Sequence, residues 1–299
     1  MKYLVTGYKG QLGYDVVREL KKRNVSDEEI YPMDIEDMDI TDRNQVMSKV
    51  KEIRPDVIFH NAAWTNVDGA EDMKEACEKV NYLGAKNMAD AAKEVGAKIV
   101  YISTDYVFDG TKDGMYEVDD KANPLSVYGK TKYQGEVAVR NYENHFIVRI
   151  SWVFGINGKN FVRTMLKLSE SRNELNVVAD QVGSPTYTVD LAKLLVDMVN
   201  TEKYGTYHAN NEGFCSWAEF AKYIFDSSNI NMTVNAIKTI EYPQKATRPL
   251  NSKLSKKSLD EAGFNRLPDW KNAVDRYKLE LISENGEEAK ILIKNRKDV

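Results

Sequence analysis

The sequence predicts an α/β fold: a doubly wound, Rossmann-like parallel sheet followed by a smaller α/β substrate domain. Segments with strand character alternate with segments of helical periodicity over the first 150 of the 299 residues. Such alternation is typical of a parallel sheet with helices on both faces. A glycine-rich turn also joins the first expected strand (residues 2–6) directly to the first expected helix (residues 14–23). That order of strand, turn and helix is typical of dinucleotide-binding folds.

The composition excludes several classes of protein. The chain has 46 acidic and 42 basic residues, a formal net charge of −4 and no basic tract, so we expect neither nucleic acid nor membrane as a partner. It has no apolar run long enough to span a membrane and no signal-peptide pattern at its N-terminus. Two cysteines do not indicate a disulfide framework. We therefore expect a cytoplasmic protein, monomeric or homodimeric.

The turn after the first strand carries Gly7, Gly10 and Gly13 in a G-x-x-G-x-x-G spacing. Glycine permits a tight turn and a close approach of the backbone to a pyrophosphate group. The N-terminus of the following helix offers unpaired N–H groups and the positive end of the helix dipole. The alternative is a tight turn that binds no ligand. The position of the three glycines between a strand and a helix favours a cofactor site.

An acidic residue follows the second expected strand. Asp34 lies 21 residues after Gly13, where a carboxylate binds the ribose 2′-hydroxyl of NAD. The same carboxylate would repel the 2′-phosphate of NADP, although Lys9 in the turn would offset that repulsion. The sequence thus leaves NADH and NADPH both open. A loop acid in contact with solvent is the alternative.

Small and polar residues follow three further expected strands, at residues 56–60, 98–102 and 145–151. In open α/β sheets, ligands bind at the carboxyl ends of the strands. We therefore expect one site to be lined by the residues directly after these strands: Ala62, Ala63, Trp64, Thr65, Thr104, Asp105 and Trp152.

Tyr128 and Lys132 are four residues apart in an expected helix introduced by Pro124 and Ser126. Residues at that spacing lie on one face, one turn apart. An ammonium group near a phenol favours the phenolate, so we expect Lys132 to lower the pKa of Tyr128 from its ordinary value of about 10. The pair would then exchange a proton with a carbonyl oxygen. The spacing also occurs by chance in many helices, so it needs support from other motifs.

Elsewhere the pattern predicts a long helix over residues 72–95. After residue 151 the alternation is less regular. We expect helices at residues 160–172, 189–201, 217–227 and 270–282, and strands at residues 176–180 and 205–209. The charged tail has one apolar run, residues 291–293. We expect it to be a frayed end or an added edge strand.

The motifs have an order and separation that resemble the extended short-chain dehydrogenase/reductase family, and within it the dTDP-4-dehydrorhamnose reductases. The resemblance extends to about residue 280. The stretches that carry it are GQLG (10–13), RPDVI (54–58), STDYVFDG (103–110), NPLSVYGKTKYQGE (123–136), SWVFG (151–155), NFVRTML (160–166), DQVGSPT (180–186) and RPLNSKL (248–254).

The resemblance implies hydride transfer from NADPH or NADH to the C4 ketone of dTDP-4-dehydro-L-rhamnose, giving dTDP-L-rhamnose. Tyr128 would donate a proton to the sugar oxygen, Lys132 would bind the nicotinamide ribose, and Thr104 would hydrogen-bond the reacting oxygen. The resemblance also places residues around the cofactor: Gly10, Gln11, Leu12, Asp39, Ile40, Ala63, Trp64, Thr65 and Ile102. Thr104, Asp105 and Trp152 would contact the dTDP-sugar.

Two further residues are candidates for the substrate diphosphate. Asn160 stands at an expected helix start and Arg248 in a proline-held loop. The alternatives are a surface salt bridge for Arg248 and core packing for Trp152. We expect a dinucleotide-binding domain at residues 1–151 and about 172–206, a substrate domain at about 152–171 and 207–285, and a tail at 286–299.

The chain departs from the family pattern at Trp64, where relatives usually have Tyr or His. Some relatives dimerise around Mg²⁺ held by carboxylates, and Asp15 and Asp190 stand in roughly those places. Acids are common on helix surfaces, so we assign no metal ligands and leave Mg²⁺ open as a further cofactor. Rival functions are a nucleotide-sugar dehydratase or epimerase and the non-catalytic regulatory subunit of methionine adenosyltransferase. Dehydratases of the family usually have Glu after the Thr-Asp pair, and this chain has Tyr106.

Overall fold

A six-stranded parallel sheet forms the centre of the computed structural model, which describes residues 1–295. The strand order reverses between β1 (Tyr3–Thr6) and β3 (Val57–His60), as in a doubly wound sheet, and the predicted fold class is confirmed. No helix among residues 1–295 has the length and apolar character needed to cross a membrane. The strands, in spatial order, are β10 (Gly205–His208), β5 (His145–Ile150), β4 (Lys98–Thr104), β3 (Val57–His60), β1 (Tyr3–Thr6) and β2 (Ile30–Met33).

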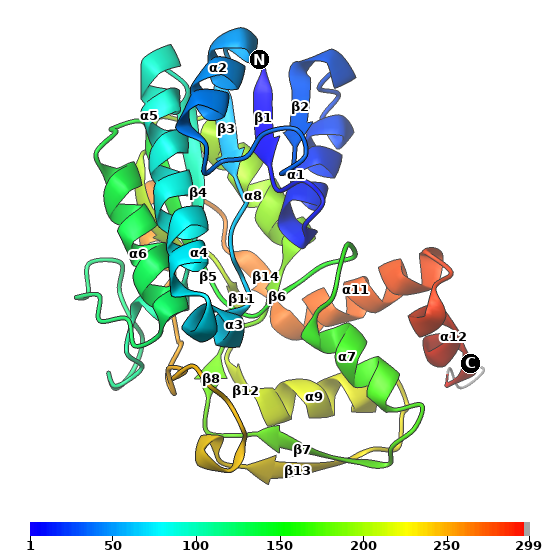
Figure 1. The fold of residues 1–299 in the computed structure, drawn as a ribbon. Helices are drawn as coiled ribbons and strands as arrows, with labels where there is room; N and C mark the ends of the chain where they lie inside the picture. The colour runs from blue at the N-terminus through cyan, green and yellow to red at the C-terminus, as the bar shows by residue number, and fades with distance from the viewer. Residues whose placement is uncertain (296–299) are drawn as a thin grey trace.

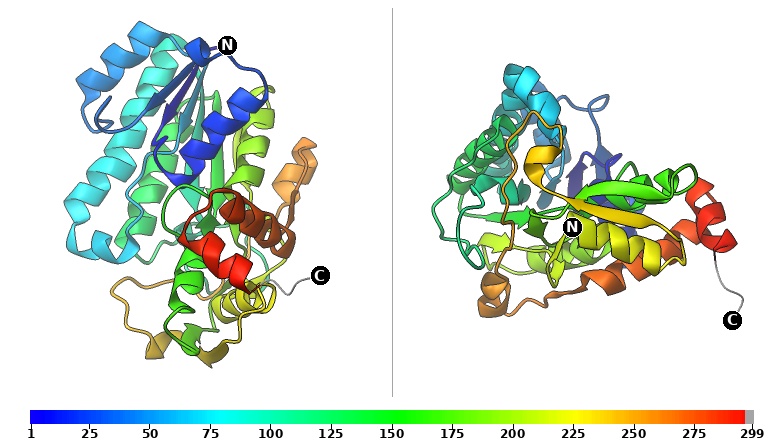
Figure 2. Two further views of the ribbon diagram at one scale, coloured as in Figure 1. Left: turned by 90° about the vertical axis from the view of Figure 1, so that its right-hand side faces the viewer. Right: turned by 90° about the horizontal axis from the view of Figure 1, so that it is seen from below.

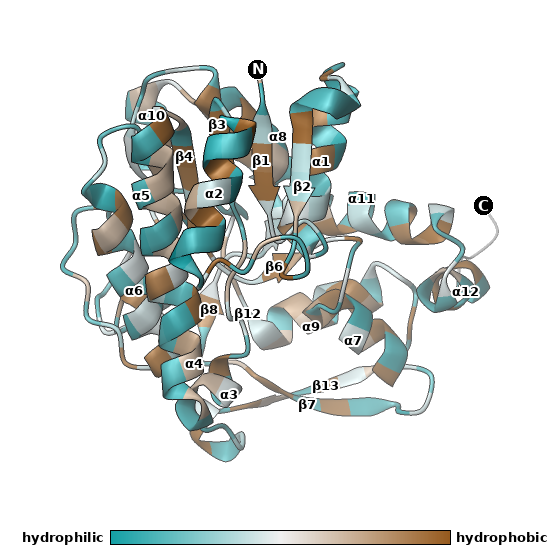
Figure 3. Ribbon diagram, turned by 45° about the horizontal axis from the view of Figure 1, so that its top comes forward, coloured by the Kyte–Doolittle hydropathy of each residue, from teal (hydrophilic) through white to brown (hydrophobic). Residues whose placement is uncertain are grey.

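Helices cover both faces of this sheet (Figure 2). One face packs on α1 (Gln11–Lys22) and α8 (Thr188–Val199). The other packs on α2 (Arg43–Ile53), α5 (Ala85–Val95) and α6 (Val127–Arg140). Side chains alternate along a strand, so Tyr3 and Val5 of β1 enter one core and Leu4 enters the other. Figure 3 shows the apolar segments that result along β1 and β4.

The long helix predicted over residues 72–95 is present from residue 74 to residue 95, but a wide π-helical turn interrupts its α-helical geometry. The run consists of α4 (Lys74–Glu78), the π-helical turn η2 (Lys79–Gly84) and α5, and a separate short helix, α3 (Val67–Asp72), precedes it. The wide turn places Asn81 where its side chain accepts from the Trp64 N–H (2.8 Å) and donates to the Trp64 carbonyl (3.1 Å). This pairing holds the segment that follows β3, and π turns are frequent at functional sites.

A smaller unit lies below the sheet in Figure 1. It contains α7 (Phe161–Leu168), β7 (Glu174–Val178), α9 (Trp217–Asp226), β13 (Thr233–Ile237) and α11 (Trp270–Ser283). Strand β7 pairs with β13 along five residues, and Leu175 and Val177 face an aromatic core. Residues 174–178 therefore lie with the smaller unit and not, as expected, with the first. Conversely, α10 (Lys257–Ala262) packs beside β10 and buries Leu259 in the first core.

The remaining elements before the tail are short. They are η1 (Asp27–Glu29), η3 (Asp105–Val107), β6 (Val153–Phe154), β8 (Val182–Gly183), β9 (Thr186–Tyr187), β11 (Asn211–Glu212), β12 (Cys215–Ser216), η4 (Thr239–Glu241) and β14 (Leu267–Asp269).

The tail is neither frayed nor a strand over its described part, so that expectation is wrong. Residues 287–294 form helix α12 (Glu287–Lys294), and residues 296–299 lie outside the described part of the chain. Ala289, Ile291 and Leu292 are buried on one side of α12, which packs against α7 and α11 (Figure 1). Ala289 and Leu292 are three residues apart and share a helix face, with Ile291 next to Leu292, and a facing core was needed to bury them.

Candidate active site

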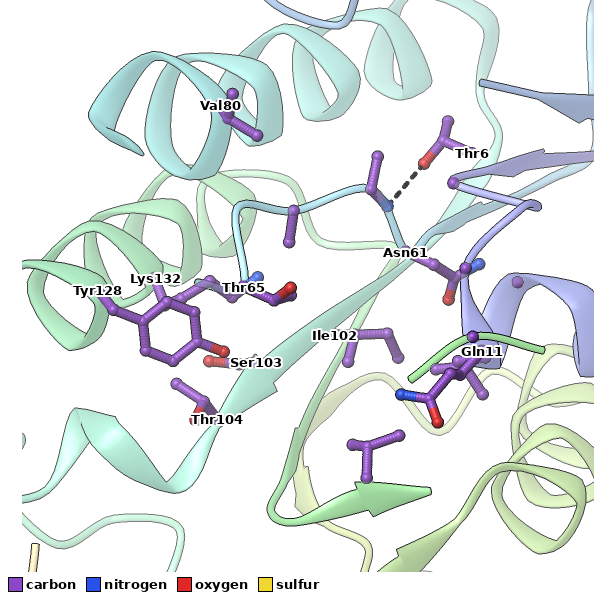
Figure 4. Close-up of a pocket in the computed structure, with 18 of the residues that line it drawn as sticks. Thr6, Gln11, Asn61, Thr65, Val80, Ile102, Ser103, Thr104, Tyr128 and Lys132 are labelled. Carbon is purple, nitrogen blue, oxygen red and sulfur yellow. Dashed lines mark hydrogen bonds between the residues drawn. The ribbon is translucent and has the colours of Figure 1, made fainter. Parts of the chain in front are cut away.

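A pocket of about 960 Å³ lies between the carboxyl edge of the sheet and the smaller unit. Its wall combines the glycine turn, the ends of β2 to β5, and two residues of α6, Tyr128 and Lys132. Figure 4 shows Tyr128 and Lys132 entering from one side and Gln11 from the other. A pocket of this volume at the strand ends is the usual position and size of a ligand site in an open α/β fold.

The glycine turn has a backbone that larger residues would obstruct. Gly7 has φ of +64°, and a Cβ atom there would lie 2.9 Å from the Ala62 backbone. A Cβ at Gly13 would lie 2.3 Å from the Gly7 carbonyl oxygen. Helix α1 starts at Gln11, and no side chain caps its N-terminal N–H groups at Gly10. The turn and helix end therefore form a cradle that fits a pyrophosphate group.

The far end of the pocket carries the acids expected beside the adenosine. Asp34 follows β2 and accepts from the Lys9 N–H at 3.3 Å, and Asp39, Ile40 and Thr41 also line the wall. The Lys9 ammonium pairs with Glu36 at 2.9 Å. The Glu36 carboxylate therefore partly neutralises the Lys9 charge, which is then less able to offset the Asp34 carboxylate.

Helix α6 brings Tyr128 close to the end of β4. The Ser126 hydroxyl caps this helix by accepting from the Gly129 N–H at 3.1 Å. A Cβ at Gly129 would lie 2.3 Å from the Tyr106 carbonyl oxygen, so glycine allows α6 to approach the turn after β4. The Tyr128 hydroxyl lies near Thr104 (Figure 4), and the neighbouring Thr104 hydroxyl acts to lower the pKa of the phenol.

The protonation behaviour of Tyr128 and Lys132 differs from expectation. Burial raises the pKa of Tyr128 above its ordinary value, and burial lowers the pKa of Lys132 to about 7. The Lys132 ammonium lies 4.1 Å from the ring centroid of Tyr101. Loss of solvation disfavours both charged forms. The expected lowering of the Tyr128 pKa by Lys132 is therefore wrong for this arrangement, and the phenol stays protonated at neutral pH.

Asp105 is buried beside Thr104 in the pocket wall and links the turn after β4 to the segment that carries Ser252. Its carboxylate accepts from the Thr104 hydroxyl at 2.9 Å and from the Ser252 hydroxyl at 2.5 Å. Burial raises the pKa of Asp105 to about 6, and these hydrogen bonds act in the opposite direction. Sequence reasoning missed Ser252, although it lies within the RPLNSKL stretch, because its partner is 147 residues away.

Glu136 is a second missed residue. It is fully buried one turn after Lys132 on α6. Its carboxylate accepts from the Ser103 hydroxyl at 2.6 Å and from two nitrogens of Arg149 at 2.8 Å each. The cluster joins α6 to the end of β4, and the charge of Glu136 raises the pKa of Lys132 against the effect of burial. The i, i+4 spacing from Lys132 was the available signal.

Trp152 lines the pocket as expected, and an aromatic neighbour accompanies it. The Trp152 ring stacks on Trp217 with centroids 3.8 Å apart and planes 18° apart. Both side chains line the wall. Trp217 was missed because the contact joins segments 65 residues apart, with no local pattern.

The structure does not bring three candidates into this pocket. The Asn160 amide is buried and donates to Gln11, Gly155 and Tyr277, while its oxygen caps α7. Arg248 forms a two-nitrogen ion pair with Asp68 at 2.8 and 3.1 Å, beside a separate cavity of about 780 Å³. The salt-bridge alternative describes Arg248 better. The Trp64 ring donates to the Asn66 carbonyl at 2.9 Å, outside the pocket wall.

The two acids considered for Mg²⁺ have protein partners. Asp15 pairs with Arg18 at 2.8 Å and accepts from Thr188. Asp190 pairs with Arg276 at 2.6 Å. Within residues 1–295 no three His, Cys, Asp or Glu side chains are grouped as metal ligands.

A doubly wound sheet, a glycine cradle and the Tyr128–Lys132–Thr104 group together define the class of short-chain dehydrogenases/reductases. The more specific family follows from comparison with known proteins: the family model described as "RmlD substrate binding domain" matches residues 1–282. The chain belongs to this family.

Named relatives cover almost the whole chain. The spore coat polysaccharide biosynthesis protein SpsK of Bacillus subtilis is 40% identical over 277 residues, 92% of this chain and 96% of SpsK. The dTDP-4-dehydrorhamnose reductase of Aggregatibacter actinomycetemcomitans is 40% identical, covering 91% of this chain and 97% of its own length. The Bacillus anthracis dTDP-4-dehydrorhamnose reductase, solved in complex with NADP, has 43% identity and a TM-score of 0.89 and covers 94% and 100%.

Proposed function

We propose that this protein reduces the C4 ketone of dTDP-4-dehydro-L-rhamnose to dTDP-L-rhamnose with NADPH or NADH, in nucleotide-sugar and cell-surface polysaccharide biosynthesis. One observation carries the proposal: Tyr128, Lys132 and Thr104 line the same pocket that the glycine turn borders at its other end. Relatives named dTDP-4-dehydrorhamnose reductase at 36–40% identity support the substrate. We also infer a cytoplasmic enzyme, monomeric or homodimeric.

The pocket residues divide between cofactor and substrate. Gly7, Gly10 and Gly13, with the N-terminus of α1, would hold the pyrophosphate, and Asp34 would meet the adenosine ribose. Ala62, Ala63, Thr65 and Ile102 also line the pocket and would border the nicotinamide. Asp105, Trp152 and Trp217 would contact the sugar nucleotide. The reduced nicotinamide supplies a hydride to C4 when bound.

Residues of the chain itself would donate the proton and stabilise the charge that develops on the reacting oxygen. Tyr128 is protonated at neutral pH because burial raises its pKa, so it can donate its proton to the C4 oxygen as the C–H bond forms. The ketone thereby becomes an alcohol and the phenol becomes a phenolate. The Lys132 ammonium, held between the effects of burial and of Glu136, would stabilise that phenolate. Thr104, fixed by Asp105, orients the reacting oxygen.

The test is the oxidation of NADPH and of NADH with enzymatically prepared dTDP-4-keto-sugar, followed by absorbance and by identification of the product. Stoichiometric consumption of the cofactor with formation of dTDP-L-rhamnose is expected. An epimerase or dehydratase would regenerate its cofactor and show no net consumption. Absence of turnover with every keto-sugar, combined with co-purification of a methionine adenosyltransferase, would replace the proposal by the regulatory-subunit function.

A further inference from the structure

Helix α12 lies beyond the region matched by the family, which ends at residue 282. It is docked by its apolar face: Ile291 and Leu292 are 7% and 4% exposed and join the core of the smaller unit. Figure 2 shows this C-terminal helix, in red, packed beside α11. An element fixed in this way is able to hold its neighbours in place.

One ion pair connects α12 to the rest of the smaller unit at a partly buried position. The Glu288 carboxylate lies 2.7 Å from Nη1 of Arg163, with the two side chains 17% and 24% exposed. The Nη2 atom of Arg163 donates to the Ile156 carbonyl at 2.7 Å. Arg163 thus bridges α12 and the loop of residues 155–160, and the carboxylate fixes the orientation of its planar guanidinium.

That loop in turn contacts the glycine turn. The Gly155 N–H donates to the Gln11 side chain at 2.9 Å, and the Asn157 amide donates to the Lys9 carbonyl at 2.8 Å. Residues 157–159 line the active-site pocket together with Lys9 and Gln11. A displacement of the loop would therefore change the wall of the pocket at the cradle for the pyrophosphate.

We propose that Glu288, acting through Arg163, is a positioning residue that holds the loop of residues 155–160 against the glycine turn and thereby increases affinity for the dinucleotide cofactor. The proposal rests on the proposed function for the identity of that cofactor. The effect has a diagnostic sign. A carboxylate by itself repels an anionic dinucleotide, so removing its charge would strengthen binding through the field alone, whereas removing a positioning contact weakens binding.

The test measures binding of NADPH and NADH by fluorescence titration, without any sugar. Glu288→Gln is expected to raise the Kd by about threefold to tenfold, the range for losing a charge-assisted hydrogen bond that is partly open to solvent. Glu287→Gln is the matched control, because its carboxylate faces Lys167 at 4.0 Å on the same two helices with both side chains exposed. The control is expected to leave the Kd unchanged or slightly lower.

A double-variant cycle checks the route through Arg163. Arg163→Met is expected to raise the Kd, and Glu288→Gln is expected to add nothing further in that background. With sugar present, the KM for the cofactor should rise in Glu288→Gln while kcat is retained.

Several results would overturn the proposal. These are an unchanged Kd in Glu288→Gln, an equal rise in Glu287→Gln, additive effects in the double variant, or a lowered melting temperature without a change in Kd. Wild-type protein that binds neither dinucleotide would refute the proposed function as well, whereas wild-type binding with an insensitive Glu288→Gln variant would refute only this inference.

Discussion

Replacing Tyr128 by Phe removes one hydroxyl and leaves the ring in place. The ring packs edge-on against Tyr106, with centroids 5.4 Å apart, and that contact needs no oxygen. The Thr104 proton is already donated to Asp105 at 2.9 Å, so Thr104 supplies a proton to the substrate only by giving up that bond. We therefore expect kcat to fall by about 10²- to 10⁴-fold, equivalent to about 3–5 kcal/mol of lost transition-state stabilisation.

The assay compares kcat with dTDP-4-keto-sugar and the Kd of the cofactor, which should change little. Tyr133→Phe is the matched control, because Tyr133 lies on the same helix and packs against a different cluster around Phe108 and Tyr116. It should retain nearly full turnover. A Tyr128→Phe enzyme within about threefold of the wild-type kcat would refute the assignment of Tyr128 as proton donor.

Three further predictions concern the same pocket. Burial lowers the pKa of Lys132 to about 7, so log kcat/KM should fall as pH rises through about 7, when the ammonium loses its charge. Lys132→Arg stays charged and should move this falling part of the pH profile to higher pH. An unchanged profile in Lys132→Arg would contradict the role assigned to Lys132. Asp34→Asn removes the carboxylate that disfavours a 2′-phosphate and should raise the NADPH over NADH ratio of kcat/KM by about 5- to 30-fold. No change is expected in the control Glu52→Gln, because Glu52 is an exposed acid on α2 outside the pocket wall. Gly13→Ala places a Cβ atom 2.3 Å from the Gly7 oxygen. This variant should lose cofactor binding in titrations, and its free energy of unfolding, measured in denaturant melts, should fall by about 1–3 kcal/mol. Gly10→Ala leaves a clearance of 3.2 Å and should show smaller changes in both measurements.

Local patterns predicted much of the active site. Gly13 is required by a contact within one strand–turn–helix unit and Gly7 by its positive φ in the same turn, and Tyr128 and Lys132 share a helix face because of helical geometry alone. Strand ends in a parallel sheet meet at one edge, so Asp34, Ala62 and Thr104 were predicted to converge without knowledge of the coordinates. The pocket brings together all three.

Electrostatics and long-range pairing needed the tertiary structure. Spacing alone placed an ammonium near the Tyr128 phenol, but burial of both groups decided the direction of their pKa shifts. Arg248 carries no local sign that Asp68, 180 residues away, binds its guanidinium. Asn160 lies at a helix start as predicted, and only packing showed that its amide is engaged by Gln11 and Tyr277.

The sequence by itself determined the alternation of strands and helices over the first 150 residues, the glycine cradle and the residues that share a helix face, because these follow from backbone geometry over a few neighbouring positions. The tertiary structure alone decided that β7 pairs with β13, that α12 docks on α7 and α11, that Ser252 binds Asp105 and that Trp217 lines the pocket. Those outcomes depend on apolar faces and polar groups finding partners far along the chain, where burial determines solvation and charge.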